Sequence, residues 1–394
     1  MLDANHPTKD GLFAVRIRVC YRRKRKYYNT GKRLSKQEWE SIPFTKVKYL
    51  CDIRKDIENS YTLVRKGVEE LASLGEFSYD ALNCKLRYAG SVTINSFFRH
   101  KISELQVENR IGTMWAYQTV LKGIERYAGN KIDIRDISVL WVQKYESFLI
   151  KEGKSQTTIG IHMRHLRAII NEIRRVGMLK DSSYPFGRGR YEIRTGANRK
   201  MALTMEQIGQ IARYDDGNST ISMYRDYWLF MYLCNGINVS DFIKLKFDDI
   251  INNEICFIRQ KTQRTSKDRK VIQSPITPPI QAIIDKWGNP PYPGCYIFPI
   301  LVGNEDAVRL KVKSLSFTKL VNKYMNKIGH NLGIGKISTY TARHSCATIL
   351  KRAGVSIAYI SDTLGHQSIK TTEHYLASFE KDERIKNANI LINY

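Results

Sequence analysis

The chain has 394 residues, enough for two or three domains, and its 42% hydrophobic and 11% aromatic residues exclude a largely disordered chain. Lys and Arg number 64 against 38 Asp and Glu, a net charge of +26, which favours nucleic acid as a partner over a membrane surface, because no separate basic amphipathic helix is present. No run of about 18 apolar residues, signal-peptide pattern or Cys-x-x-Cys pair occurs, so we expect a cytoplasmic protein with seven reduced cysteines and no zinc site.

Residues 11 to 34 predict two short strands with one basic face. In LFAVRIRVCY, apolar residues alternate with Arg16 and Arg18, which is the period of a half-buried strand. The turn YRRKRK adds further candidates for DNA binding: Arg22, Arg23, Lys24 and Arg25. A solvated edge that discourages strand pairing is the alternative. We favour DNA because the bases are concentrated on one face and its turn.

The next elements are predicted to be helical. Ser35 and Glu38 form a capping-box pattern ahead of a short helix, and a longer helix is expected from about Lys46 to Leu74. Residues 91 to 180 read as about four helices. In the last, Gln156 to Val176, an apolar stripe opposes a face that carries Arg164, Arg167, Asn171 and Arg175. A merely soluble outer face is the alternative, but the shortage of acids beside these bases favours DNA.

Residues 181 to 200 are rich in Gly, Arg and turn formers and predict a basic linker at a domain boundary. Thr204 and Gln207 then give another helix-capping signal. Helices are expected at 219–235, 240–244, 278–287, 314–328, 341–353, 357–363 and 368–376. The segments EICFIRQ and RKVIQSPI predict a β-hairpin. The last part of the chain is therefore expected to be mostly helical with one small sheet.

Three short motifs follow one another in this last part: FIRQKTQ (257–263), TYTARHSCAT (339–348) and LGHQSIKTTEHY (364–375). Their order and separations resemble the tyrosine recombinase, or phage-type integrase, family. That family has an arginine–histidine helix, then Leu-Gly-His, then a tyrosine nine residues past that histidine. Arg343, His344, His366 and Tyr375 stand at these positions. The motif resemblance covers about residues 200 to 385 and extends more loosely over the rest.

The chemistry of these side chains agrees with the resemblance. Metal-free cleavage of a phosphodiester needs a nucleophile, cations for the non-bridging oxygens and a proton donor for the leaving 5′ oxygen. Tyr375 is a phenol that cationic neighbours would activate, and Arg343 offers a planar fork for phosphate. His366 can donate a hydrogen bond, and Lys261, expected on the first hairpin strand, resembles the family lysine that protonates the leaving group. Each residue alone could equally be packing or solvated surface. No cofactor and no metal are expected.

Two positions depart from the family pattern. Where the family has its first arginine, in a segment like T-G-L-R-x-S-E, this chain has Asn238 within NGINVSD, and the H-x-x-R histidine is replaced by Tyr340. Arg259 is the best candidate for the missing cation, because on an extended strand its side chain would leave the same face as that of Lys261. An exposed strand residue is the alternative. The combination resembles integrases of Bacteroides-type mobile elements.

The resemblance implies a mainly α fold with small β elements. Residues 1–88 would be an N-terminal arm-type DNA-binding domain, 91–180 a helical SAM-like core-binding domain, 181–200 the linker and 201–394 the catalytic domain with its tail. The implied function is site-specific recombination through a 3′-phosphotyrosine, by four subunits on paired duplex sites. DNA-bending factors of the host or the element would be further partners. A DNA-binding architectural or regulatory protein that has lost catalysis is the alternative, and a type IB topoisomerase is a further one.

Overall fold

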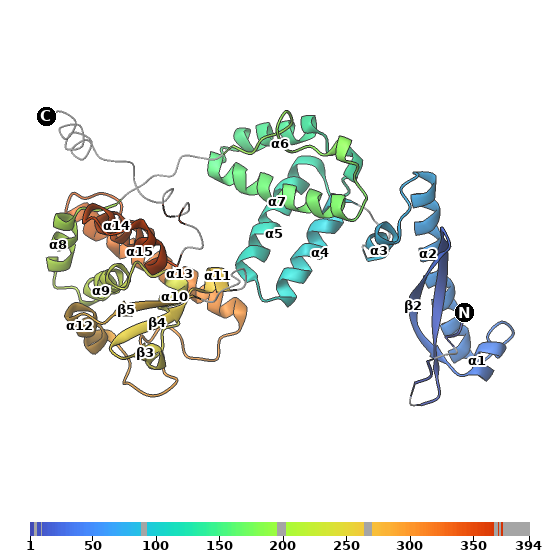
Figure 1. Ribbon diagram of the computed structural model, residues 1–394, viewed down its shortest axis with the longest axis horizontal. Helices are drawn as coiled ribbons and strands as arrows, with labels where there is room; N and C mark the ends of the chain where they lie inside the picture. The colour runs from blue at the N-terminus through green and yellow to red at the C-terminus, as the bar shows by residue number, and fades with distance from the viewer. Residues whose placement is uncertain are drawn as a thin grey trace. The chain divides into compact units, whose positions relative to one another are not determined.

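Figure 1 shows the computed structural model, which describes residues 1–3, 6–8, 10–87, 93–194, 202–263, 270–365, 369 and 372. The chain divides into two compact units, residues 1–197 and 198–394. Both contain mostly helices and a small antiparallel sheet, so the predicted fold class is confirmed. Among the described residues, no helix has the length and apolar character needed to cross a lipid bilayer.

The first unit begins with an antiparallel pair of strands, β1 (Phe13–Tyr21) and β2 (Lys24–Leu34). Arg22 and Arg23 join them, with φ of 45° and 63°, in the left-handed region that two-residue hairpin turns require. The turn is therefore shorter than the YRRKRK segment predicted. Lys24 and Arg25 lie at the start of β2 instead, because so tight a turn lets pairing begin with Tyr21 opposite Lys24.

Three helices follow the hairpin: α1 (Lys36–Ser41), α2 (Lys48–Ser73) and α3 (Tyr79–Arg87). The predicted capping box is confirmed, since the Ser35 hydroxyl accepts the Glu38 N–H and the Glu38 carboxylate accepts the Ser35 N–H. Ile17 and Val19 of β1 are buried together with α2 residues, while Arg18 is exposed. The predicted alternation of β1 is thus confirmed, and its basic face remains on the surface.

Residues 93–194 contain four helices, as predicted: α4 (Ile94–Val107), α5 (Ile111–Ala128), α6 (Val139–Lys151) and α7 (Gln156–Arg175), with a short 3-10 turn at Ile134–Asp136. The apolar stripe of α7 is buried throughout: Ile159, Met163, Leu166, Ile170 and Ile173. His162 also points inward, 3% exposed, and its Nδ1 lies 2.8 Å from the Tyr145 hydroxyl. Burial lowers the pKa of His162 to about 4, so the imidazole is neutral at pH 7.

The second unit contains helices around a three-stranded antiparallel sheet of order β3-β4-β5. The strands are β3 (Ile250–Ile251), β4 (Glu254–Ile258) and β5 (Val271–Pro275). The helices are α8 (Met205–Arg213), α9 (Ser219–Leu233), α10 (Val239–Phe242), α11 (Gln260–Gln263), α12 (Pro278–Trp287), α13 (Ala307–Asn331), α14 (Thr339–Arg352) and α15 (Ile357–Thr363), with 3-10 turns at Asp181–Ser183 in the first unit and Phe247–Asp249 in the second. The predicted hairpin is confirmed as β4 and β5. The helix predicted at 368–376 lies outside the described residues apart from 369 and 372.

Helix α9 lies at the centre of this second unit. Trp228 and Phe230 are fully buried, within an apolar cluster that also draws on α12 and α13. The Trp228 indole donates a hydrogen bond of 2.9 Å to the Ser338 carbonyl, directly ahead of α14. The core therefore fixes the start of the helix that carries Arg343 and His344.

Candidate catalytic site and nucleic-acid interface

Helix α14 places Arg343 in the interior of the second unit, 4% exposed. Its guanidinium donates through Nη1 to the Gly236 carbonyl at 2.9 Å and through Nη2 to the Leu364 carbonyl. These acceptors lie on two separate segments, one after α9 and one at the end of α15. A buried guanidinium held by two backbone carbonyls has little rotational freedom, so its charge is preorganised.

Gly236 makes this approach possible. Its φ is 63°, and a Cβ at this position would lie 2.8 Å from the Arg343 Cα. Any larger residue would therefore have to push α14 away from the loop. The glycine sets how closely the arginine helix can approach the segment that precedes Asn238.

Arg259 meets the same turn of chain from the other side. Its Nη1 donates to the Gly365 carbonyl at 3.1 Å, one residue beyond the Leu364 carbonyl that Arg343 contacts. Gly365 has φ of 61°, and a Cβ there would lie 3.3 Å from the Arg259 Cδ. Two guanidinium groups from distant parts of the sequence thus hold consecutive carbonyls directly ahead of His366.

The route by which Arg259 reaches this turn differs from the prediction. Strand β4 ends at Ile258, and α11 begins at Gln260, so Arg259 and Lys261 are not alternate residues of one strand. The chain leaves the strand here because the buried Asp241 carboxylate accepts the Gln260 N–H at 3.1 Å, which satisfies a donor at the start of α11. Lys261 is exposed on α11. The prediction that both side chains leave one strand face is therefore wrong.

Asp241 is a site residue that the sequence did not single out. It is 4% exposed, and burial raises the pKa of its carboxyl group, against the opposing effects of the Gln260 N–H, Arg259, a hydrogen bond from Asn238 and Arg343. The Asn238 amide is thus a partner of this carboxylate. The sequence signal was an acid among the apolar residues of VSDFIKL, and acids in such segments are rarely buried without partners.

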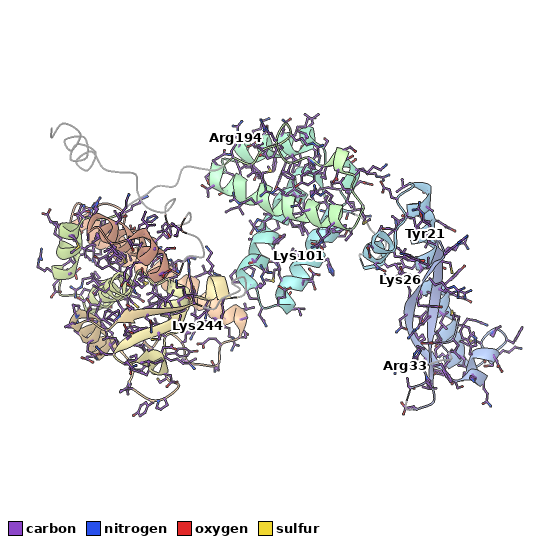
Figure 2. The ribbon with its side chains drawn as sticks, in the orientation of Figure 1. Tyr21, Lys26, Arg33, Lys101, Arg194 and Lys244 are labelled. Carbon is purple, nitrogen blue, oxygen red and sulfur yellow. The ribbon has the colours of Figure 1, made fainter. Side chains whose placement is uncertain are left out.

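Lys244 is a second cation close to the corner where β4 ends and α11 begins. Its Nζ donates to the Gln260 Oε1 at 2.8 Å, and partial burial lowers the pKa of the ammonium group, opposed by the charge of Asp241. It is labelled in Figure 2. The corner therefore presents an arginine and two lysines, Lys244 and Lys261, around a buried carboxylate.

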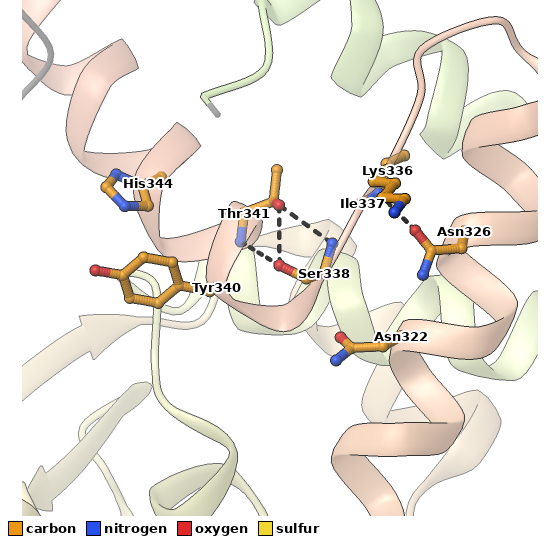
Figure 3. A pocket seen from close by; sticks show the side chains of 8 residues that line it. All are labelled: Asn322, Asn326, Lys336, Ile337, Ser338, Tyr340, Thr341 and His344. Atoms are coloured by element: carbon orange, nitrogen blue, oxygen red, sulfur yellow. Dashed lines mark hydrogen bonds between the residues drawn. The ribbon is translucent and has the colours of Figure 1, made fainter. Parts of the chain in front are cut away.

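His344 and Tyr340 are carried by the same helix as Arg343. His344 is 5% exposed, and the exposed Tyr340 ring meets it edge to face, with centroids 4.4 Å apart. Both residues line a cavity of about 200 Å³, whose lining side chains are drawn in Figure 3. Asn322 and Asn326 close its far wall, where their side-chain oxygens accept backbone N–H groups at the start of α14. Tyr340 thus lies against the buried histidine that follows Arg343.

Two predicted catalytic residues, His366 and Tyr375, lie outside the described residues. The described chain reaches Gly365, so the structure brings Arg343 and Arg259 to the residue immediately before His366. Among the described residues there is no group of three or more His, Cys, Asp or Glu side chains that could hold a metal ion.

The arginines of the two strands, Arg16, Arg18, Arg25 and Arg33, lie on one side of the N-terminal hairpin, whereas Lys24 and Lys26 pair with Tyr21 and Val19 on the other side. Arg18 pairs with Tyr27 across the strands, and Cys20 pairs with Arg25. Arg16 lies beside Asn29 and is half-buried, with an ion pair of 2.8 Å to Asp3. The sequence missed the contribution of β2 to this face, which also includes Arg33 (Figure 2). Alternation along KYYNTGKR was the available signal.

The three arginines predicted on α7 are all exposed: Arg164, Arg167 and Arg175. They are on the side opposite the buried stripe, as predicted. Part of the segment expected as a linker is folded against this helix: Phe186 and Tyr191 are 3% and 6% exposed, and the Tyr184 hydroxyl donates to the Asn171 side-chain oxygen of α7 at 2.6 Å. Residues 195–200, the remainder of that segment, lie outside the described residues.

Comparisons with known proteins agree with this architecture. Residues 201–382 match the model of the phage integrase family, and residues 93–193 match the phage integrase SAM-like domain. A protein of Pseudothermotoga lettingae named tyrosine recombinase is 25% identical over 261 residues, which cover 64% of this chain and 82% of that protein. The Tn1549 transposon integrase, solved with a circular intermediate DNA, superposes with a TM-score of 0.57 at 16% identity over 76% of this chain and 99% of that one. A lambda integrase tetramer bound to a Holliday junction gives 0.53 at 16% identity, covering 96% of both chains.

Proposed function

The chain belongs to the phage integrase family of tyrosine site-specific recombinases, and we propose that it cleaves and rejoins duplex DNA through a phosphotyrosine at Tyr375. The phenolic oxygen attacks the scissile phosphorus, forms a 3′-phosphotyrosine and releases a 5′-oxygen. A 5′-hydroxyl of the partner strand then attacks the phosphotyrosine and restores the backbone. No external energy source is required, because the phosphotyrosyl ester conserves the energy of the bond that was cut.

The observation that carries the proposal is the convergence of Arg343 and Arg259 on the consecutive carbonyls of Leu364 and Gly365. The residue that follows is His366, the histidine of the Leu-Gly-His motif. In our proposal the two guanidinium groups and His366 stabilise the charge that develops on the non-bridging oxygens. Preorganised donors of this kind act most strongly where water is excluded. Arg343 is almost completely buried, which supports its part in such a site.

Arg259 takes the place of the arginine that the family carries at position 238. Asn238 supplies no charge, and its amide is instead a partner of the buried Asp241 carboxylate. Asp241 in turn holds the Gln260 N–H and fixes the corner from which Arg259 extends. Lys261, exposed on α11 one residue further along, is the proposed donor of a proton to the leaving 5′-oxygen. His344 and Tyr340 supply hydrogen-bond donors beside Arg343.

Two basic surfaces would hold the DNA. One is the exposed sheet face with Arg16, Arg18 and the hairpin residues Arg22, Arg23, Lys24 and Arg25, and the other is the outer face of α7. Phosphate neutralisation by such residues supplies most of the sequence-independent affinity. We propose that four subunits act in the cytoplasm on paired sites to move a mobile element, with DNA-bending proteins as partners.

A covalent-trapping experiment tests the proposal. A duplex built from the DNA that flanks the element is nicked beside the candidate cleavage site, so that religation is prevented. The wild-type protein should form an adduct that peptide mapping assigns to Tyr375, while Tyr375→Phe should bind with nearly unchanged affinity and form none, because one phenolic oxygen is lost and the basic contacts remain. An adduct of the Phe variant at another residue would refute the assignment. Specific binding without any adduct would favour the catalytically inactive architectural protein.

A further inference from the structure

Residues 185–191, with the sequence PFGRGRY, form a closed turn, here called the Arg188 turn. The Arg190 N–H donates to the Gly187 carbonyl at 3.0 Å, and the Gly187 N–H donates to the Tyr191 carbonyl at 3.1 Å. Gly189 has φ of 74°, which a glycine adopts at the third position of such turns at little cost. Arg188 therefore occupies the second position of a defined turn.

Side chains on both sides of the turn fix it to the helical domain. Arg190 donates through Nη1 to the Asp181 carbonyl at 2.9 Å and to the Tyr184 carbonyl. The Tyr184 hydroxyl donates to the Asn171 side-chain oxygen of α7 at 2.6 Å, and the Phe186 and Tyr191 rings meet edge to face at 5.9 Å. The second arginine of the Gly-Arg-Gly-Arg sequence is thus used to anchor the turn to the residues that precede it.

The segment lies along the basic stripe of α7. Its start is bonded to Asn171, and near its end the Arg194 carbonyl lies 3.3 Å from the position of a Cβ on Gly160. Residues 160, 164, 167 and 171 succeed one another at helical spacings of four, three and four, so they form one stripe of the helix surface. Arg164 and Arg167 of this stripe are exposed between the two contacts.

Arg188 differs from the arginines of α7 in what surrounds it. Arg188 is exposed, and both of its neighbours, Gly187 and Gly189, lack a side chain. The space beside these glycines is open, because a Cβ at either position would have no atom within 4 Å. An arginine on a helix face can reach a phosphate, but the helix itself is too wide to follow the side chain into a narrow groove. An arginine on a slim, glycine-flanked turn can enter a groove about 6 Å wide, and narrow A·T minor grooves attract arginine through their negative potential.

We propose that Arg188 inserts into the minor groove of A·T-rich duplex DNA while Arg164 and Arg167 contact the adjacent phosphates. This inference rests on the proposed DNA-binding function and adds to it a determinant of base composition. The turn would distinguish A·T from G·C because the guanine 2-amino group occupies the floor of the minor groove.

Competition binding with three synthetic polymers tests the inference: poly(dA-dT), poly(dI-dC) and poly(dG-dC). Inosine lacks the 2-amino group, so poly(dI-dC) has the minor groove of A·T pairs and the major-groove pattern of G·C pairs. The wild-type protein should bind poly(dA-dT) and poly(dI-dC) about tenfold more tightly than poly(dG-dC), and Arg188→Gln should remove most of this difference. The control Arg167→Gln should weaken binding to all three polymers by a similar factor, because phosphates carry no sequence information.

Three results would overturn the inference: no polymer preference in the wild type, an equal loss for all polymers in Arg188→Gln, or a preference in which poly(dI-dC) behaves like poly(dG-dC). The last would indicate readout in the major groove. Covalent trapping of the wild-type protein, measured in parallel, separates this proposal from the catalytic one. An adduct without polymer preference refutes only the role of Arg188, and preference without an adduct refutes only catalysis.

Discussion

Replacement of Arg259 by alanine should slow phosphotyrosine formation by about 10²–10³-fold, equivalent to about 2.7–4 kcal/mol of transition-state stabilisation. The side chain contacts the Gly365 carbonyl at 3.1 Å, next to the carbonyl that Arg343 contacts. Its removal would leave one guanidinium where the proposed site has two. DNA affinity should change little, because one phosphate contact is a small part of the total.

Part of this loss could arise from a displaced Leu-Gly-His turn, since Arg259 also anchors Gly365. Arg259→Lys keeps the charge but cannot reproduce the planar fork, so its rate should fall between those of wild type and Arg259→Ala. Lys270→Ala is a matched control for the anchoring of α15. Lys270 pairs with Asp362 on that helix, but both side chains are exposed, so the ion pair contributes at most about 1 kcal/mol and cleavage should be nearly normal.

The assay is single-turnover adduct formation on the nicked duplex at saturating protein, with binding measured separately. Near-normal adduct formation by Arg259→Ala would remove this residue from the site. Addition of Asn238→Arg to that variant should restore part of the rate if the new side chain reaches the same oxygens. Incomplete rescue is expected, because Asn238 is a hydrogen-bond partner of Asp241 and a misplacement of about 1 Å can cost 10²-fold.

Three further predictions concern stability and domain independence. In denaturant titrations, Gly236→Ala should lower the free energy of unfolding by about 2–3 kcal/mol, and the control Gly217→Ala by only about 1 kcal/mol. Both glycines have positive φ, but of the two only Gly236 has a backbone atom within 3 Å of the new Cβ. Stability should fall by about 3 kcal/mol between pH 6.5 and 4, because the buried His162 binds a proton less readily folded than unfolded, and His162→Gln should flatten this pH dependence. Deletion of residues 1–87 should abolish footprints at one class of sites and leave core-site cleavage intact; loss of all DNA binding by a folded truncation would contradict separate surfaces.

The sequence predicted those features of the fold that depend on local patterns. The buried and basic faces of α7 follow from a 3.6-residue period, and the capping boxes at Ser35 and Thr204 follow from side chains three residues apart. Arg343 could likewise be placed from its motif and its helix. The interactions that decide the helix faces and the capping boxes lie within one or two turns of the same segment, whereas the carbonyls that hold the Arg343 side chain are distant in sequence.

Features decided by distant contacts were not predictable. The end of β4 at Ile258 depends on Asp241, which is 19 residues away from Gln260 in sequence and supplies the acceptor that begins α11. No periodicity in FIRQKTQ reports that bond. The segment 181–194 has no apolar period either, and its fold depends on Arg190 bonding to carbonyls and on aromatic residues that pack against the helical domain. Sequence patterns detect propensity, whereas these turns are fixed by tertiary hydrogen bonds.

The proposed replacement of an arginine at position 238 by Arg259 is understandable through Asp241. An arginine at 238 would stand one helical turn from this buried carboxylate and could compensate its charge. With asparagine there, the carboxylate has an amide hydrogen bond, and the remaining compensation comes from the Gln260 N–H and from Arg259 and Arg343. A buried carboxylate without such partners would be strongly unfavourable. Asp241 therefore favours a cation where β4 ends and α11 begins. Arg259 lies at this position, and its guanidinium reaches the turn that precedes His366.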